Sequence, residues 1–193
     1  MRPARGWSTP WAAAGRRAAP RARHSTSPGP APIHPNAALI ETFYAAFRRR
    51  DAAAMGACYG PTVTFQDPVF TLAGWRARAM WRMLCERGKD LRVSVSDIQG
   101  DATTGSARWE AWYTFSATGR PVHNVITAHF EFTDGSIVRH VDHFDLHRWA
   151  SQALGLKGLL LGWAPPVQRN IRRQAARSLD AYIQSRGLSE RTA

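Results

Sequence analysis

His140 and Asp142 are the two ionisable residues whose spacing most clearly allows chemistry. The segment 137–146 alternates in the manner of a β-strand, and residues two apart on a strand project from the same face. The imidazole and the carboxylate can therefore approach each other or a common ligand. This arrangement fits two interpretations: a pair that moves protons, or a satisfied polar pair that lines a binding cavity.

The opposite face of the same segment carries an H-x-D-x-H pattern, formed by His143, Asp145 and His147. Imidazole and carboxylate groups in such a row can hold a metal ion. A fourth ligand is not evident in the sequence. We therefore expect a solvated or dimer-facing strand surface and no bound metal.

Asp67 is the third candidate, and it directly precedes Pro68 after a β-rich stretch. At the mouth of an apolar pocket a carboxylate has a raised pKa, which brings it closer to what proton abstraction needs. The alternative is an ordinary turn in which the carboxylate bonds local amides.

The elements that must position these residues follow from periodicity and turn signals. Asn36 can cap a helix whose apolar residues recur at helical spacing, and Gly60-Pro61 ends a short second helix. A third helix is expected at about 75–86. Helices first and an antiparallel meander afterwards indicate an α+β fold with the helices on one face of the sheet. The predicted strands cover residues 63–65, 91–98, 107–115, 122–132 and 137–146.

Two stretches of the chain resemble the opening and the last hairpin of ketosteroid isomerases and SnoaL-like proteins of the nuclear transport factor 2-like superfamily: FYAAFRRRDAAAMGACYGPTVTFQDPV (43–69) and HNVITAHFEFTDGSIVRHVDHFDLHRW (123–149). The resemblance covers about 36–149. It implies a cone-shaped α+β barrel, in which a curved antiparallel sheet wraps on the N-terminal helices around one apolar pocket. A tail at 1–35 and a C-terminal helical extension at 150–187 lie outside it.

By this resemblance His140 and Asp142 face the interior of the cone, and Asp67 takes the place of the general base of the isomerases. The expected catalytic residues are therefore Asp67, His140 and Asp142. The inward residues that we expect to bind a substrate are Trp109, Tyr113, Asn124 and Phe144.

The match to the isomerases breaks at their oxyanion hole, which needs a Tyr and a protonated Asp. Phe43 and Ala128 stand in those places, and neither donates a hydrogen bond. Tyr44 is one position off and points about 100° away around the helix. Steroid isomerisation by that mechanism is therefore not expected.

The motif HVDHFD (140–145) also resembles limonene-type epoxide hydrolases, in which Asp142 matches one acid. Those enzymes also need an Arg and a second Asp on a neighbouring strand. Strand alternation turns Arg108 and Glu110 outward, so this activity stays a minor alternative.

Two main classes of function remain. One is a cofactor-independent isomerase, cyclase or hydratase that moves protons on a small apolar carbonyl compound. The other is a non-catalytic ligand-binding or protein-interaction module of the same fold. We expect no cofactor. The expected partners are a small apolar ligand and a second copy of the chain, paired through the outer face of the sheet.

The net charge of +12 is concentrated at the two ends, with +6 in residues 1–35 and +4 in residues 165–193. The core carries only +2, so nucleic-acid binding is not expected. The tail contains no acid and little apolar periodicity, and we expect it to be disordered. Its composition also resembles an organellar transit peptide, so organellar targeting stays open beside the cytoplasmic location that we expect.

Three further features bear on location and partners. No apolar run approaches the roughly 20 residues that span a bilayer. Cys58 and Cys85 are expected to be reduced thiols. The basic C-terminal segment can bind a membrane surface, or its apolar stripe can pack on its own domain or on a partner.

Overall fold

Residues 34–190 are described in the computed structural model, so the predicted tail at 1–35 lies almost entirely outside the described residues. Helix α1 (Pro35–Arg48) opens with a proline, which favours the first helical turn. Its apolar residues recur at helical spacing and form one buried face. They are Ile40, Phe43, Tyr44 and Phe47.

Asn36 does not cap α1, contrary to the prediction. His34 is the cap residue, and its Nδ1 accepts a hydrogen bond of 3.1 Å from the backbone N–H of Asn36. The buried Asn36 side chain instead donates to the carbonyl oxygens of Asp101, at 2.7 Å, and Ala102, at 3.2 Å. Its amide therefore fastens the start of α1 to a turn 65 residues further along the chain.

Helices α2 (Ala52–Ala57) and α3 (Trp75–Arg87) follow close to the predicted positions. Asp51 caps α2, because its Oδ1 accepts from the backbone N–H of Ala54 at 3.0 Å. The buried residues of α3 include Met80 and Trp81, which join the core formed by α1.

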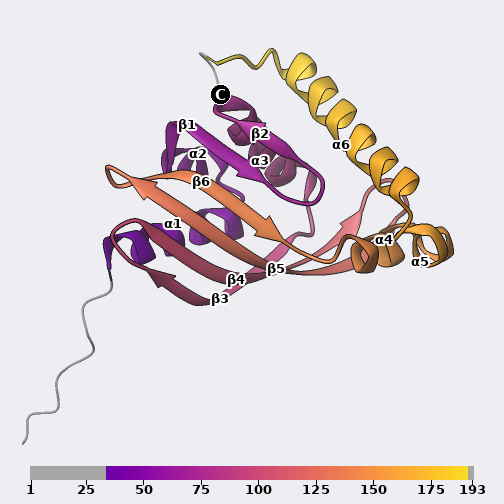
Figure 1. Ribbon diagram of the computed structural model, residues 1–193. Helices are drawn as coiled ribbons and strands as arrows, with labels where there is room; N and C mark the ends of the chain where they lie inside the picture. The colour runs from indigo at the N-terminus through magenta and orange to yellow at the C-terminus, as the bar shows by residue number, and fades with distance from the viewer. Residues whose placement is uncertain (1–33, 191–193) are drawn as a thin grey trace, which may run out of the picture. The chain divides into compact units, whose positions relative to one another are not determined.

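Six strands form one sheet in the order β2-β1-β6-β5-β4-β3. Neighbouring strands are antiparallel except β1 and β6, which pair in parallel. Helices α1, α2 and α3 lie on one side of this curved, unclosed sheet (Figure 1). The predicted α+β architecture is confirmed, while the short β2 and the parallel pair were not predicted. The strands are β1 (Tyr59–Gln66), β2 (Thr71–Ala73), β3 (Arg92–Gly100), β4 (Thr104–Phe115), β5 (Arg120–Thr133) and β6 (Ser136–His143).

Burial alternates along the strands as the periodicity predicts. In β4, Trp109 is buried and its neighbour Arg108 is exposed. Opposite pairs in the register, such as Phe130 with His140, are both buried. The candidate residues of β4, β5 and β6 therefore project toward the helices, where the core lies.

Strand β6 ends earlier than predicted. It stops at His143, and Asp145 caps helix α4 (Leu146–Leu154) by accepting from the backbone N–H of Arg148 at 3.0 Å. His147 is a residue of that helix, and its Nε2 donates to the carbonyl of Leu159 at 2.9 Å. The expectation that His143, Asp145 and His147 share one strand face is therefore wrong, because Asp145 caps α4 and His147 lies within that helix.

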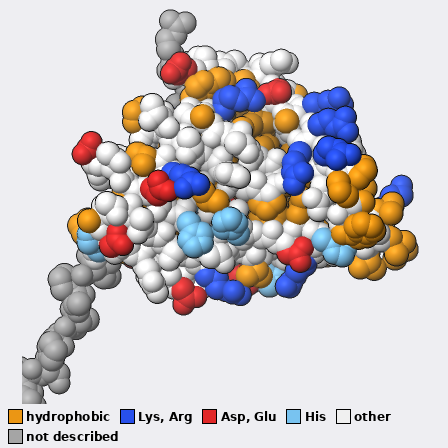
Figure 2. Space-filling model, in the orientation of Figure 1, with side chains coloured by type: hydrophobic (Ala, Val, Ile, Leu, Met, Phe, Trp, Pro, Cys, Tyr) orange, Lys and Arg blue, Asp and Glu red, His pale blue; other side chains and the backbone are white. Residues whose placement is uncertain are grey.

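Two more helices complete the described chain, α5 (Leu156–Leu161) and α6 (Pro165–Arg186). The apolar stripe of α6 packs on its own domain, with Ile171, Leu179 and Ile183 buried. The large side chains of α5 are exposed, and Figure 2 shows hydrophobic side chains gathered where α5 lies. Among the described residues, no helix is long and apolar enough to cross a membrane.

Candidate functional site

A chain of hydrogen bonds runs through the core and includes three of the predicted site residues, His140, Asp142 and Trp109. The hydroxyl of Tyr59 lies 2.8 Å from Nε1 of Trp81 and 2.7 Å from Nδ1 of His140. Nε2 of His140 lies 3.0 Å from Oδ1 of Asp142, and Nε1 of Trp109 reaches the same oxygen at 3.2 Å. The predicted pairing of His140 with Asp142 is therefore present.

The proton positions in this chain follow from which atoms can only donate. The indole N–H of Trp81 can only donate, so the Tyr59 oxygen accepts from it. The Tyr59 O–H then donates to Nδ1 of His140, and the Nε2–H of His140 donates to Asp142. With this arrangement both ring nitrogens of His140 have a partner.

The pair is closed off from solvent, with His140 0% and Asp142 3% exposed. Aromatic rings surround the imidazole: Trp81 stacks on it at 5.9 Å between centroids, and Phe130 lies at 4.3 Å. Burying polar groups is tolerated here because each has a partner. The geometry therefore favours the structural interpretation of this pair over direct contact with a ligand.

Tyr44 points into the same core beside Phe43. Its ring lies 5.8 Å from that of Trp109, and its hydroxyl is buried with no hydrogen-bond partner among the described residues. Burial, followed by the negative charge of Asp142, holds the pKa of Tyr44 well above its usual value. Tyr44 is rotated by one residue from Phe43 around the helix, yet both side chains are buried, because the core surrounds both positions.

Asp67 follows directly on β1 and forms the turn that the alternative interpretation predicts. Its Oδ1 accepts from the backbone N–H groups of Val69, at 2.7 Å, and Phe70, at 2.5 Å. Its Oδ2 has no hydrogen-bond partner among the described residues. One oxygen is therefore held firmly, while the other is free to take a proton.

Burial raises the pKa of Asp67 from 3.8 to about 7; the two backbone hydrogen bonds oppose this shift, and the charge of Asp142 adds to it. The C-terminal helices pack on the turn that follows Asp67. Arg172 of α6 donates from Nε to the carbonyl of Pro68 at 2.8 Å, and Val69 packs with residues of α4 and α6. In the part of the chain that the structure describes, no hydrogen bond or ion pair joins Asp67 to His140.

The four predicted substrate-binding residues differ in their surroundings. The hydroxyl of Tyr113 accepts from Nε1 of Trp149 at 2.8 Å, and burial, with a smaller contribution from the charge of Asp67, raises its pKa. Asn124 is half-buried and Phe144 packs between the two apolar clusters. The indole N–H of Trp109 donates to Asp142. Tyr113 therefore lies close enough to Asp67 for the carboxylate charge to raise the pKa of its hydroxyl.

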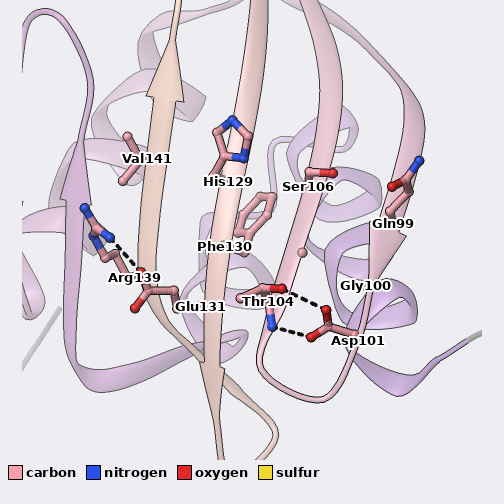
Figure 3. A pocket seen from close by; sticks show the side chains of 11 residues that line it. Gln99, Gly100, Asp101, Thr104, Ser106, His129, Phe130, Glu131, Arg139 and Val141 are labelled. Carbon is pink, nitrogen blue, oxygen red and sulfur yellow. Dashed lines mark hydrogen bonds and ion pairs between the residues drawn. The ribbon is translucent and has the colours of Figure 1, made fainter.

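Two cavities stand out in the described residues, and neither is lined by Asp67, Tyr113, Asn124 or Asp142. The larger, of about 530 Å³, lies over β3 to β6, where Arg139 and Glu131 form an ion pair of 2.6 Å (Figure 3). The smaller, of about 220 Å³, lies beside β1 and β2. The interior where a pocket is expected is filled with aromatic side chains, which include Phe43, Phe47, Tyr59, Trp81 and Trp109.

The arrangement found in epoxide hydrolases is not formed around Asp142. Arg108 is exposed and lies 3.6 Å from Glu110, whose other carboxylate oxygen is 2.6 Å from Nε2 of His123. These three residues belong to the outer face, as the strand alternation predicts.

Sequence reasoning missed Tyr59 and Trp81, the two residues that complete the hydrogen-bond chain. Trp81 is visible in the sequence as part of the amphipathic third helix. Its contact with Tyr59 depends on how α3 packs on β1, which periodicity does not report.

The fold is a curved sheet that packs on three helices. It buries the His140–Asp142 pair in its apolar core and holds a second carboxylate, Asp67, beside the C-terminal helices. These features define a class of α+β proteins with ionisable groups inside an apolar fold. The chain belongs to the SnoaL-like domain family, whose model matches residues 40–140. No curated protein sequence matches the chain.

Solved structures show the same fold at low sequence identity. A protein of Xanthomonas campestris pv. campestris, classed provisionally as a polyketide cyclase, is 24% identical over 62% of this chain and 96% of its own, with a TM-score of 0.51. An NTF2-like protein of unknown function from Burkholderia pseudomallei is 18% identical over 63% and 98%, with a TM-score of 0.54. A LEH-like epoxide hydrolase of M. tuberculosis is 20% identical over 65% and 92%, with a TM-score of 0.51.

Proposed function

We propose that this SnoaL-like protein is a cofactor-independent enzyme, an isomerase, cyclase or hydratase, that moves a proton on a small apolar carbonyl compound, with Asp67 as the base. The observation that carries the proposal is the Asp67 turn. Two amides hold one carboxylate oxygen, the other is free, and burial raises the pKa to about 7. A base with this pKa both accepts and returns a proton near neutral pH.

Tyr113 supplies the hydrogen bond that the substrate carbonyl needs. Its oxygen accepts from Trp149, which leaves the phenolic proton uncommitted among the described residues. As Asp67 takes a proton from the carbon beside the carbonyl, negative charge develops on the carbonyl oxygen, and a donor there stabilises it. This role replaces the donors that Phe43 and Ala128 cannot provide.

His140 and Asp142 act on the reaction through electrostatics and position. Asp142 contributes to the raised pKa of Asp67, and the bond to His140 fixes the Asp142 carboxylate. Trp109 completes this support, while Asn124 and Phe144 contact the substrate from the neighbouring strand and loop.

Hydrogen–deuterium exchange tests the proposal. In D₂O, a set of small apolar ketones is expected to gain deuterium beside the carbonyl only when the protein is present, at a rate that rises with pH until about 7. Asp67→Asn keeps the acceptor for the two amides but cannot take a proton, so exchange is lost. Asp134→Asn, at an exposed turn, removes the same charge and leaves exchange unchanged. Exchange that survives in the Asp67 variant refutes the proposal.

A non-catalytic ligand-binding or interaction module is the second candidate. The closed His140–Asp142 pair and the aromatic filling of the interior favour it, because both resemble a stable core rather than a reacting site. This candidate predicts that Asp67→Asn binds a small apolar ligand as tightly as the wild-type protein does.

We also propose that the protein forms a homodimer through the outer face of the sheet. Trp112 stacks on His123 with 4.7 Å between ring centroids, and Val125 lies half-buried beside them. An apolar centre with the charged groups of Arg108 and Glu110 around it suits a contact between identical faces.

A further inference from the structure

The largest exposed apolar side chains of the described residues gather on α5 and the turn that follows it. Leu156 is 75% exposed, Leu160 is 66% exposed and Trp163 is 65% exposed. Leu159 and Leu161 are more than half exposed as well. Contiguous apolar surface of this kind is rare on a protein that stays free in water, and it marks a contact surface.

This exposure is built into the sequence of α5. Glycines occupy the side that packs on α4: a Cβ at Gly158 would lie 1.8 Å from the carbonyl oxygen of Ala150, and one at Gly162 would lie 3.0 Å from the Ala150 side chain. The small residues therefore face inward and the leucines face outward. An amphipathic helix that only packs on its own domain has the reverse arrangement.

Positive charge lies next to the leucines. Residues 146–179 contain six Lys and Arg and no acid. Arg169, Arg173 and Arg177 are exposed, and none has a carboxylate partner among the described residues. Figure 2 shows Lys and Arg side chains gathered over α6 beside the apolar surface.

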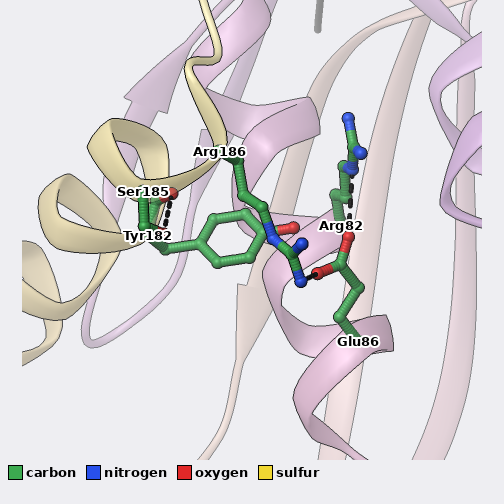
Figure 4. A network of polar contacts seen from close by, with 5 residues as sticks. All are labelled: Arg82, Glu86, Tyr182, Ser185 and Arg186. Carbon is green, nitrogen blue, oxygen red and sulfur yellow. Dashed lines mark hydrogen bonds and ion pairs between the residues drawn. The ribbon is translucent and has the colours of Figure 1, made fainter.

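The end of α6, after Arg177, is different, because its charges are neutralised. Arg186 bonds Glu86 of α3 at 2.6 Å, beside the ring of Tyr182 (Figure 4). Asp180 of α6 forms an ion pair with Arg76 of α3, also at 2.6 Å. These contacts anchor the end of α6 to the domain and leave the unpaired arginines on the part of the helix that is nearer to α5.

We propose that α5 and the part of α6 up to Arg177 form a docking surface for an anionic lipid bilayer, independent of the function proposed for Asp67. Leucines enter the boundary between head groups and acyl chains, while arginines bind lipid phosphates. The indole N–H of Trp163 already donates to the carbonyl of Leu160 at 3.0 Å, so the ring can enter an apolar layer without an unpaired donor.

A second copy of the chain is a poorer occupant of this surface. A two-fold contact places the same patch on both sides of the interface. Arg169, Arg173 and Arg177 of each copy would then approach their equivalents, and no described acid between 146 and 179 could offset the repulsion.

Flotation of the full-length chain with lipid vesicles tests the proposal. We expect binding to phosphatidylcholine vesicles that contain about one-third phosphatidylglycerol, weaker binding to phosphatidylcholine alone, and a loss of binding as salt rises. Leu156→Gln with Leu160→Gln abolishes binding. Arg173→Gln with Arg177→Gln lowers the partition coefficient about 25-fold, at about fivefold for each arginine.

The matched control is Arg48→Gln with Arg49→Gln, which removes the same charge from exposed residues at the end of α1. It is expected to bind as the wild-type protein does, and unchanged circular dichroism checks that every variant folds. The proposal is overturned if the wild-type chain does not float with anionic vesicles, or if the control loses as much binding as the α6 variant. Dimers that the leucine variant dissociates, with no vesicle binding, would assign the surface to a second copy instead.

Discussion

Replacing Tyr59 with Phe removes one oxygen from the buried hydrogen-bond chain and leaves two partners unsatisfied. The Nε1–H of Trp81 loses its acceptor and Nδ1 of His140 loses its donor. Tyr59 is 4% exposed, so water does not readily replace the lost hydroxyl. Each buried polar atom without a partner costs about 1–3 kcal/mol, so the variant, with two such atoms, is expected to lose about 2–6 kcal/mol of unfolding free energy.

Tyr44→Phe is the matched control, because it removes the same oxygen from a tyrosine that is equally buried. The Tyr44 hydroxyl has no partner among the described residues, so its removal leaves no other group unpaired. It also relieves the desolvation of the hydroxyl itself. We expect unfolding free energy to stay within about 0.5 kcal/mol of the wild-type value or to rise by about 1 kcal/mol.

Urea unfolding followed by far-UV circular dichroism measures both variants. With a slope of about 2 kcal/mol per molar, Tyr59→Phe shifts the midpoint down by about 1–3 M, whereas Tyr44→Phe leaves it in place or raises it by up to about 0.5 M. Equal losses in the two variants would mean that Tyr44 has a partner of its own. A Tyr59 variant as stable as the wild-type protein would contradict the proton assignment in the chain.

Three further predictions concern other parts of the molecule. The unfolded chain releases the Asp67 proton near pH 4 and the folded chain near pH 7. The unfolding free energy of the wild-type protein is therefore expected to fall by about 2–4 kcal/mol as the pH rises from 4 to 7, and to stay level above pH 7. Urea unfolding at a series of pH values measures this fall, which Asp67→Asn abolishes. Val125→Glu puts charge at the centre of the proposed dimer contact, and light scattering is expected to show a dimer for the wild-type chain and a monomer for the variant. Asn36→Ala removes the donor to Asp101 and Ala102 and is expected to cost about 1–3 kcal/mol in thermal unfolding.

Each of these predictions can fail in a distinct way. A wild-type stability that does not fall between pH 4 and 7 means that the Asp67 carboxyl is better solvated than its surroundings imply. A monomeric wild-type chain at micromolar concentration refutes the dimer. An Asn36 variant of unchanged stability means that solvent satisfies the turn as well as the amide does.

Side-chain faces within single elements could be predicted from the sequence, because they depend on local period. The alternation that separates Trp109 from Arg108, and places His140 and Asp142 on one face, needs only the pleat of a strand. The spacing of Ile40, Phe43 and Phe47 likewise needs only the turn of a helix. These predictions agree with the burial of each residue.

Features that depend on distant partners were not predicted. Asn36 is a residue type that often caps helices. Here its side-chain amide donates instead to the carbonyl oxygens of Asp101 and Ala102, which the fold brings close to it. The strand pattern runs past His143, yet Asp145 begins a helix because α4 packs on the sheet. Tyr59 meets His140 only through the parallel pairing of β1 with β6, for which no local pattern exists.

That parallel pairing has a consequence for how the chain folds. Tyr59 pairs with Ile137, so the sheet joins two neighbouring strands, β1 and β6, that are synthesised far apart. The antiparallel hairpins β3–β4 and β4–β5 are more local and can form as the chain emerges from the ribosome. The edge of β1 has no β6 beside it until residue 143 is available, and an unpaired strand edge promotes aggregation. We therefore expect completion of the sheet to be the slow step of folding, and chains that end before β6 to depend on chaperones.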